Sequence, residues 1–283
     1  MNTNLDRIHD GVEYLSSQVE DGLCREFYQL KHGPSTSWTT SCIGSTLSEF
    51  QAVPRGMTEA VLSLQEENGG WSYNQKVSAD PDSTLRVLQF LAKIKSKDNE
   101  VIDKAEHFVI SHQQPDGGLA TYLPESLKTM GYPEGGWTTS HPCVTALASR
   151  ILRDKSAKKK ASDYVKSRLA KGDARSYWWA TPWYVRYESG CLNGENIGED
   201  VVEISLALLL KARLNIPDQK LLSRLTAIQL KDGSFPPSHQ FRIPRPTQYL
   251  DDISDQTEII EDRKRIFSTA AAVVAISRQE ALL

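Results

Sequence analysis

Apolar positions along the chain recur in two alternating kinds of segment. In the first kind they are spaced by three and four residues, which predicts helices with one buried face. These segments span residues 6–18, 57–65, 101–113, 158–170 and 218–229. In the second kind most of the helix circumference is apolar, and a helix of this type must be buried on all sides. These segments span residues 44–51, 82–94, 141–152, 199–214 and 266–277. The alternation predicts tandem helical hairpins.

A short turn motif closes four of the half-exposed helices. It reads Gln, three residues, Gly, one residue and then a mostly large apolar residue, and it begins at Gln18, Gln65, Gln113 and Gln229. The glycine is the expected helix stop, because it adopts left-handed backbone angles at little cost. The intervals are 47, 48 and 116 residues, and a degenerate fifth copy around Gly172 lies within the last interval. No linker separates the copies, so residues 1–283 are predicted to form a single all-α domain.

The same pattern indicates how the hairpins are arranged. Alternating half-exposed and fully buried helices fit two concentric rings better than an open superhelix, which needs polar end caps. We therefore expect an α/α toroid of five to six hairpins. In this geometry the inner helices open with Ser, Thr or Asp, at Ser45-Thr46, Asp82-Ser83-Thr84, Asp200 and Ser268-Thr269.

Composition excludes several classes of protein. The 33 Lys and Arg residues face 36 Asp and Glu residues, so the net charge of -3 provides no attraction to nucleic acid. No run reaches the roughly 18 apolar residues of a membrane span, and the first residues lack the apolar stretch of a secretory signal. The four cysteines are scattered without a CxxC pair, which argues against a disulfide framework. These features predict a cytoplasmic protein with reduced thiols.

Four ordered segments resemble the squalene-hopene and oxidosqualene cyclases, a family of triterpene cyclases within the class II terpene cyclase and prenyltransferase toroids. The turn motifs resemble the QW motifs of that family. The segments are 69–91, with GGW followed by an Asp-rich run, 134–152, with a second GGW, the aromatic stretch 173–190, and 232–244. The resemblance covers most of residues 56–280. It implies an α/α toroid that cyclises an isoprenoid or a similarly apolar substrate by acid catalysis, without a cofactor.

The resemblance also implies a proton donor. The family's acid motif reads DxDD, and its middle Asp protonates an alkene or an epoxide to start a carbocation cascade. This chain has Asp80-Pro81-Asp82-Ser83, so the donor maps to Asp82, and Ser83 replaces the helper Asp. Asp80 and Ser83 would tune the acid. The alternative is that Asp82 only caps the helix that starts there.

Aromatic residues form a second candidate constellation. Trp38 and Trp137 occupy matching WTTS sequences, and a dense cluster follows at Tyr177, Trp178, Trp179, Trp183, Tyr184 and Tyr187. Ring faces stabilise cations by roughly 0.5 to 2 kcal/mol each, which suits a cavity that hosts carbocations. We expect Trp38, Trp137, Tyr177, Trp178, Trp179, Trp183, Tyr184 and His141 to line the substrate pocket. The alternative for these rings is packing in the core.

Two other functions fit the same fold. One is a non-catalytic toroid that binds a lipid or a partner protein. The other is metal-dependent prenyl transfer, since the chain resembles protein prenyltransferase β subunits, which use comparable inner-helix starts to hold zinc. The comparable residues here are Asp80, Asp82, His141 and Cys143. Against this, His141-Pro142 also suits a simple helix start.

The resemblance leaves one structural requirement open. Triterpene cyclases close their cavity between two toroids, whereas this chain supplies one. Either the loops at 114–140 and 171–198 cover the cavity, or a second copy or a partner protein caps it, or the substrate is small. An apolar substrate also fits peripheral contact with a membrane during uptake.

Overall fold

The computed structural model describes residues 3–29, 31–192, 196–254 and 256–283, and most of them are helical. The helices are α1 (Asn4–Ser17), α2 (Ser37–Glu49), α3 (Met57–Leu62), α4 (Pro81–Lys93), α5 (Asn99–Ser111), α6 (Pro124–Thr129), α7 (Pro142–Ile151), α8 (Lys155–Ala170), α9 (Trp183–Ser189), α10 (Val201–Arg213), α11 (Gln219–Ala227) and α12 (Ile266–Glu280). The prediction of a helical protein is confirmed. Within these residues, no helix combines the length and the apolar character that crossing a membrane requires.

Three small antiparallel sheets join the loops between helices. They are β1 (Glu26–Gln29) with β2 (Gly33–Ser35), β3 (Trp71–Ser72) with β4 (Ala79–Asp80), and β5 (Phe241–Ile243) with β6 (Glu258–Ile260). Two short 3-10 helices, at Gly136–Thr138 and Leu250–Asp252, complete the described elements. The strands hold loop segments beside the ends of the buried helices, where the candidate site lies.

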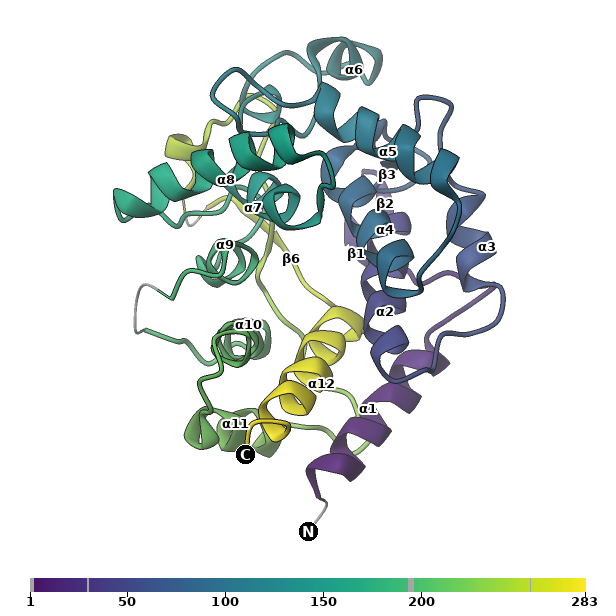
Figure 1. The fold of residues 1–283 in the computed structure, drawn as a ribbon, viewed down its shortest axis with the longest axis vertical. Helices are drawn as coiled ribbons and strands as arrows, with labels where there is room; N and C mark the ends of the chain where they lie inside the picture. The colour runs from purple at the N-terminus through teal and green to yellow at the C-terminus, as the bar shows by residue number, and fades with distance from the viewer. Residues whose placement is uncertain (1–2, 30, 193–195, 255) are drawn as a thin grey trace.

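Six helices form a closed circuit of contacts. Helix α2 packs on α4, α4 on α7, α7 on α9, α9 on α10 and α10 on α12, and α12 returns to α2. Helices α1, α3, α5, α8 and α11 pack against this circuit from the periphery (Figure 1). Burial follows the hydrophobic pattern, because α10 buries most of its residues whereas α1 buries only Ile8, Gly11 and Leu15. The two kinds of predicted helix therefore occupy two different environments.

The observed helices correct the sequence prediction in several places, and α6 lies within the segment 114–140 that was expected to be a loop. Helix α2 begins at Ser37, seven residues before the predicted start, so Ser45 and Thr46 lie inside the helix and do not open it. The misplaced start has a physical cause, because Thr39 and Thr40 look like loop residues although both are fully buried. The short helix α9 was not predicted, since its sequence is dominated by aromatic residues with weak helix propensity.

The glutamine of the turn motif ties consecutive repeats together. Gln229 Nε2 donates to the Gly233 carbonyl of its own turn at 2.9 Å and to the Arg7 carbonyl of α1 at 2.8 Å. The last turn is therefore fastened to the first helix, and α1 and α12 lie side by side (Figure 1). The corresponding pairs of acceptors are Gly69 and Val101 for Gln65, and Gly117 and Ala157 for Gln113.

A second bond fastens each turn to a buried helix. The backbone N–H of Trp71, the last residue of its turn motif, donates to Thr84 Oγ1 in α4 at 2.9 Å. The same bond recurs from Cys24 to Thr40, from Leu119 to Thr145 and from Phe235 to Thr269. Each of these four turns is thus bonded to the inner helix that follows it, through a threonine inside that helix.

Removing the glutamine that joins the last turn to the first helix is expected to lower stability. Gln229→Ala deletes three partly buried hydrogen bonds: the two that Nε2 donates to the carbonyls of Gly233 and Arg7, and one that Oε1 accepts from the Arg7 guanidinium at 3.3 Å. We expect the free energy of unfolding to fall by about 2 kcal/mol, measured by urea denaturation. Gln18→Ala is the matched control, because within the described ranges the Gln18 amide bonds Ser17 Oγ alone. Equal losses in both variants would contradict this role for Gln229.

Candidate active site

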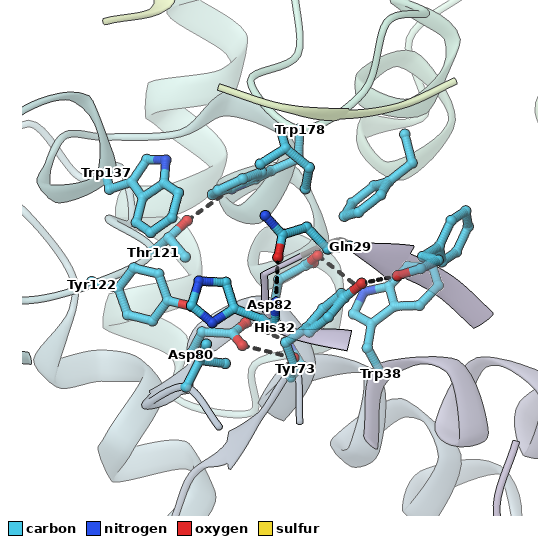
Figure 2. Close-up of a pocket in the computed structure, with 15 residues that line it drawn as sticks. Gln29, His32, Trp38, Tyr73, Asp80, Asp82, Thr121, Tyr122, Trp137 and Trp178 are labelled. Atoms are coloured by element: carbon cyan, nitrogen blue, oxygen red, sulfur yellow. Dashed lines mark hydrogen bonds between the residues drawn. The ribbon is translucent and has the colours of Figure 1, made fainter. Parts of the chain in front are cut away.

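An apolar pocket lies at the end of the helix circuit where α4 begins. Trp38 of α2 and Asp82 of α4 contribute to its wall (Figure 2). Ser83 of α4 and Phe241 of β5 line it as well. The space between the lining atoms is about 740 Å³ with the open solvent at the mouth included. The lining residues are Phe27, Gln29, His32, Trp38, Tyr73, Val77, Asp80, Asp82, Ser83, Thr121, Tyr122, Trp137, Trp178, Phe241 and Ile243.

The two aspartates of the pocket have different roles in local structure. Asp80 is the N-cap of α4, and its carboxylate accepts from the Ser83 backbone N–H and the Ser83 hydroxyl, both at 2.7 Å. Asp82 lies in the first turn and does not cap the helix. Its Oδ2 accepts from Trp38 Nε1 at 3.0 Å, while its buried Oδ1 has no hydrogen-bond partner in the described part of the chain. Capping therefore explains Asp80 but not Asp82.

Burial raises the pKa of both carboxyl groups toward neutral pH. Desolvation raises the pKa of Asp82 to about 6, although the Arg86 charge and the Trp38 N–H act in the opposite direction. Desolvation likewise raises the pKa of Asp80 to about 7, against the hydrogen bonds from Ser83. A protonated Asp82 can thus exist near neutral pH. When its proton leaves, Trp38 and Arg86 stabilise the carboxylate that forms.

Three of the predicted rings line the pocket and surround this carboxyl group. Trp38, Trp137 and Trp178 face the same space (Figure 2). Trp137 and Trp178 lie 5.6 Å apart between ring centroids, and the Trp137 indole N–H donates to the Pro244 carbonyl at 3.0 Å. Their ring faces are therefore held in place by the surrounding chain.

His141 lies behind the pocket wall and does not contribute to the lining. Its Nδ1 is 2.6 Å from Thr121 Oγ1, and its Nε2 is 2.8 Å from the Gly136 carbonyl. Because a carbonyl only accepts, Nε2 carries the proton and Nδ1 accepts from Thr121. Thr121 Oγ1 in turn accepts from Trp178 Nε1 at 2.9 Å. Burial lowers the pKa of His141 to about 3, so this neutral ring orients Thr121 and, through it, Trp178.

Four other predicted rings lie outside the pocket lining. Tyr177 stacks on His141 at 3.8 Å between centroids, and its hydroxyl donates to the Gln248 carbonyl. Trp179 and Tyr184 stack on each other at 4.7 Å. The Trp183 indole donates to the Asn196 carbonyl. All four are fully buried, so in this structure they support the wall instead of facing the space.

Sequence reasoning missed much of the lining. The missed residues lie in the loops between a turn motif and the following inner helix, and they include Gln29, His32, Tyr73, Tyr122 and Phe241. Tyr73 comes two residues after Trp71, and Tyr122 three residues after Leu119. Since the inner helices start at one end of the circuit, the loops leading into them meet there. Aromatic residues shortly after a turn motif were therefore the signal in the sequence that could have predicted these lining residues.

A buried carboxyl pair lies behind the Phe27 wall of the pocket. Glu26 and Asp262 face each other and are both fully buried. Glu26 Oε1 accepts from the Phe27 backbone, and Asp262 accepts from the backbone N–H groups of Phe267 and Ser268 at the start of α12. Desolvation and the neighbouring Asp262 carboxylate raise the pKa of Glu26. Burial and the neighbouring carboxylate thus favour the protonated form of Glu26.

The buried pair of Glu26 and Asp262 is expected to lower the free energy of unfolding as pH rises. The folded-state pKa of Glu26 is raised above its ordinary value of 4.5. Its stabilising contribution is therefore complete below about pH 4.5 and is lost as pH rises toward the folded-state pKa. Glu26→Gln keeps a neutral group in place, so its stability should depend less on pH between about 5 and 9 in urea titrations. Exposed Glu125→Gln is the control, and a slope unchanged by Glu26→Gln would refute this assignment.

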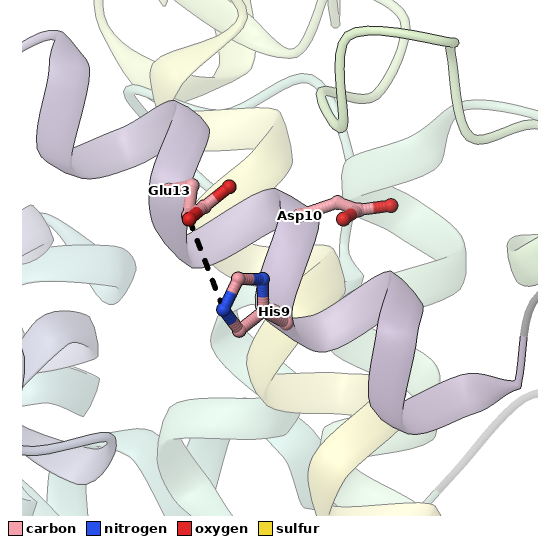
Figure 3. A group of neighbouring side chains, drawn as sticks. All are labelled: His9, Asp10 and Glu13. Atoms are coloured by element: carbon pink, nitrogen blue, oxygen red, sulfur yellow. Dashed lines mark ion pairs between the residues drawn. The ribbon is translucent and has the colours of Figure 1, made fainter.

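The structure does not assemble the predicted metal ligands. Asp80, Asp82, His141 and Cys143 do not form a metal-ligating group, and both ring nitrogens of His141 are occupied by Thr121 and Gly136. In the described ranges, one group of three potential ligands lies close together, namely His9, Asp10 and Glu13 (Figure 3). It lies on the peripheral helix α1, where His9 and Glu13 are largely solvent-exposed. His9, Asp10 and Glu13 are not among the residues that line the pocket.

The pocket thus combines a carboxyl group whose pKa is raised toward neutral pH, apolar walls and several aromatic ring faces. This combination can protonate an apolar substrate and stabilise the resulting cation. The fold is that of the type II terpene cyclases, and the resemblance seen in the sequence is confirmed at the level of fold.

Individual structures show how close the likeness is. Type II terpene cyclase MstE from Scytonema superposes with a TM-score of 0.83 over 100% of both chains, at 21% sequence identity. A protein from Actinoplanes gives a TM-score of 0.85 over 98% of this chain and 100% of that chain, at 23% identity. MstE has also been solved with geranylgeranyl dihydroxybenzoate as its substrate.

Sequence comparison finds a shorter match. Drimenyl diphosphate synthase from Streptomyces showdoensis is 29% identical over 92 residues, which make up 31% of this chain and 17% of that protein. The chain therefore matches only a small part of this curated relative. No family model matches the sequence.

Proposed function

We propose that this chain is a class II-type terpene cyclase, which cyclises an isoprenoid or a comparably apolar substrate by acid catalysis. One observation carries the proposal: Asp82 lies in an aromatic-lined apolar pocket, with one oxygen bonded to Trp38 Nε1 and the other buried without a partner in the described residues. The fold shared with type II terpene cyclases supports it. So does the substrate of MstE, whose geranylgeranyl part is an isoprenoid chain.

In the proposed reaction Asp82 donates its proton to a carbon–carbon double bond or an epoxide oxygen of the substrate. The resulting cation is attacked by a further double bond of the same molecule, which closes a ring and moves the positive charge. Loss of a proton from a neighbouring carbon ends the reaction, so substrate and product are isomers. Trp38, Trp137 and Trp178 stabilise the intermediate charge, and the apolar walls keep water from quenching it.

Asp80 and Ser83 position the acid in this proposal and do not donate protons themselves. Both oxygens of Asp80 accept from Ser83, and together they fix the first turn of α4, which carries Asp82. His141 and Thr121 hold the Trp178 indole. Tyr177, Trp179, Trp183 and Tyr184 support the wall from outside the lining.

We further propose that residues 1–283 act as a single α/α toroid of five to six hairpins whose own loops enclose the substrate. The lining supports this view. The lining residues Thr121, Tyr122, Trp137 and Trp178 come from the two loops expected to cover the cavity, and β5 adds Phe241 and Ile243. A capping partner or a second copy is therefore not needed to build the walls.

A substrate panel tests the proposed activity. The purified chain is incubated with prenyl alcohols, prenyl diphosphates, terminal epoxides and prenylated dihydroxybenzoates, and products are identified by mass spectrometry. We expect at least one substrate to give a cyclic isomer. Binding of these molecules without conversion would favour a non-catalytic lipid-binding protein, and conversion that depends on an added divalent metal would favour prenyl transfer chemistry.

A further inference from the structure

A second hollow lies at the other end of the buried helices. It is lined by residues in the later turns of α2 and α4, among them Ser45, Arg86 and Lys93, and by residues of α9, α10 and α12. Its space is about 560 Å³ with the mouth included. It shares no lining residue with the Asp82 pocket. Trp38 and Arg86 separate the two spaces, with the guanidinium carbon 5.4 Å from the indole centroid.

The wall of this second hollow is divided into a polar and an apolar half. Helices α2, α4 and α9 contribute serine, arginine, lysine, glutamine, tyrosine and glutamate side chains. Helices α10 and α12 contribute Leu206, Leu209, Ala270, Ala271 and Val274. A molecule that fills the space therefore meets charged groups on one side and hydrocarbon on the other.

The charged groups of this wall and their salt-bridge partners together carry a positive surplus. Fully buried Glu188 pairs with Arg86 of the lining at 3.1 Å and with Arg150, which lies outside the lining, at 2.6 Å. Glu49 pairs with Lys93 of the lining and with Arg278, which also lies outside it. The lining itself thus holds two cations and two anions, and the two further arginines supply the surplus. An additional anion would be attracted to this wall.

Two buried polar atoms of the hollow lack partners in the described residues. They are Arg86 Nε and Ser45 Oγ, and the exposed fractions of these residues are only 6% and 5%. Buried donors are satisfied in the great majority of native structures, by protein, water or a bound group. Both residues line the same space and both can donate to an oxygen atom. An unfilled acceptor position therefore lies beside the positive surplus.

We propose that the second hollow is a binding site for a small amphipathic anion. Its carboxylate or phosphate head would lie against Arg86, Lys93 and Ser45, and its hydrocarbon part against α10 and α12. Binding of such an anion does not require cyclase activity. A fatty acid and a prenyl phosphate share this chemistry, and the test below separates them.

Calorimetric titration of the full chain with decanoate, geranyl phosphate and uncharged decanol tests the proposal. We expect decanoate or geranyl phosphate to bind at least tenfold more tightly than decanol, and the tighter of the two identifies the head group. Lys93→Gln, which removes one charge, and Ala271→Phe, which fills the apolar half, should each weaken anion binding at least tenfold. Val77→Trp, which narrows the Asp82 pocket, is the control and should leave it unchanged.

Three results would overturn the proposal. The first is the absence of a preference for the anions, seen either as decanol binding as tight as that of both anions or as no binding of either anion. Ordered water would then be the partner of Arg86 Nε and Ser45 Oγ. The second is binding that is lost in Val77→Trp and retained in Ala271→Phe, which would place the ligand in the Asp82 pocket. The third is unchanged binding in Lys93→Gln. Lys93→Gln keeps the test decisive if Ala271→Phe fails to fold.

Discussion

Asp82→Asn is expected to reduce product formation by about a thousandfold or more while leaving the fold intact. The substitution preserves shape, and the amide oxygen can still accept from Trp38 Nε1. It removes the transferable proton, and general acid catalysis of this kind contributes about 10² to 10⁴ in rate, more when no other acid can substitute. The measurement is the rate of product formation on the substrate identified by the panel, together with circular dichroism and the melting temperature.

Two comparisons make this result specific to Asp82. Asp21→Asn changes an exposed aspartate in the first turn motif and should keep full activity. The wild-type rate should also depend on pH, because only protonated Asp82 can act as the donor. Since the pKa of Asp82 is raised to about 6, activity should fall about tenfold per pH unit above about pH 6. Retained turnover in Asp82→Asn would exclude the assigned role.

The largest expected effect on stability comes from Gly136→Ala. A Cβ at this position would lie 1.6 Å from the Gln248 carbonyl oxygen and 2.7 Å from the Tyr177 hydroxyl. The nearest atom belongs to the backbone, so the two loops must separate. Overpacking usually costs about 1 to 3 kcal/mol, and a backbone clash belongs at or above the upper end of this range. We expect a loss of about 3 kcal/mol or more, and a melting temperature lower by about 6 °C or more.

The same substitution should reduce activity through Trp137. This ring follows Gly136 directly, and its backbone and indole N–H groups donate to the carbonyls of Pro246 and Pro244. Gly198→Ala is the matched control, because its Cβ would meet only the far end of the Glu203 side chain, which can move. The control should change stability by less than about 1 kcal/mol. Similar melting temperatures for the two variants would contradict the contact between the Gly136 loop and residues 244–248.

Much of the fold could be predicted because the repeat carries two independent signals. Hydrophobic spacing separated peripheral from buried helices, and the turn motif marked where each peripheral helix ends. The structure explains the motif physically, because Gln229 bonds its own turn and α1, and Gly233 packs against the Asp10 carbonyl of α1 with a positive φ of 83°. Helix α2 was placed less well, since buried threonines gave its first turns the composition of a loop.

The candidate site was harder to predict than the fold. Asp82 was found through its motif, but the identity of the pocket rings depends on loop paths that no period specifies. Tyr73, Tyr122 and Phe241 come from three loops that converge only in three dimensions. Conversely, the rings of residues 177–184 were expected to line the pocket, but of these rings only Trp178 does so. A run of neighbouring rings cannot point in one direction, and most of these rings pack behind the wall.

Incubation of the protein with the substrate that the panel identifies, in deuterium oxide, tests the central claim most directly. Asp82 exchanges its proton with solvent, so an acid-initiated cyclisation should place one deuterium on a carbon of the product, detected by mass spectrometry and located by NMR. Asp82→Asn should form no labelled product. A cyclic product without solvent-derived deuterium would show that the reaction starts in another way and would contradict proton donation from Asp82.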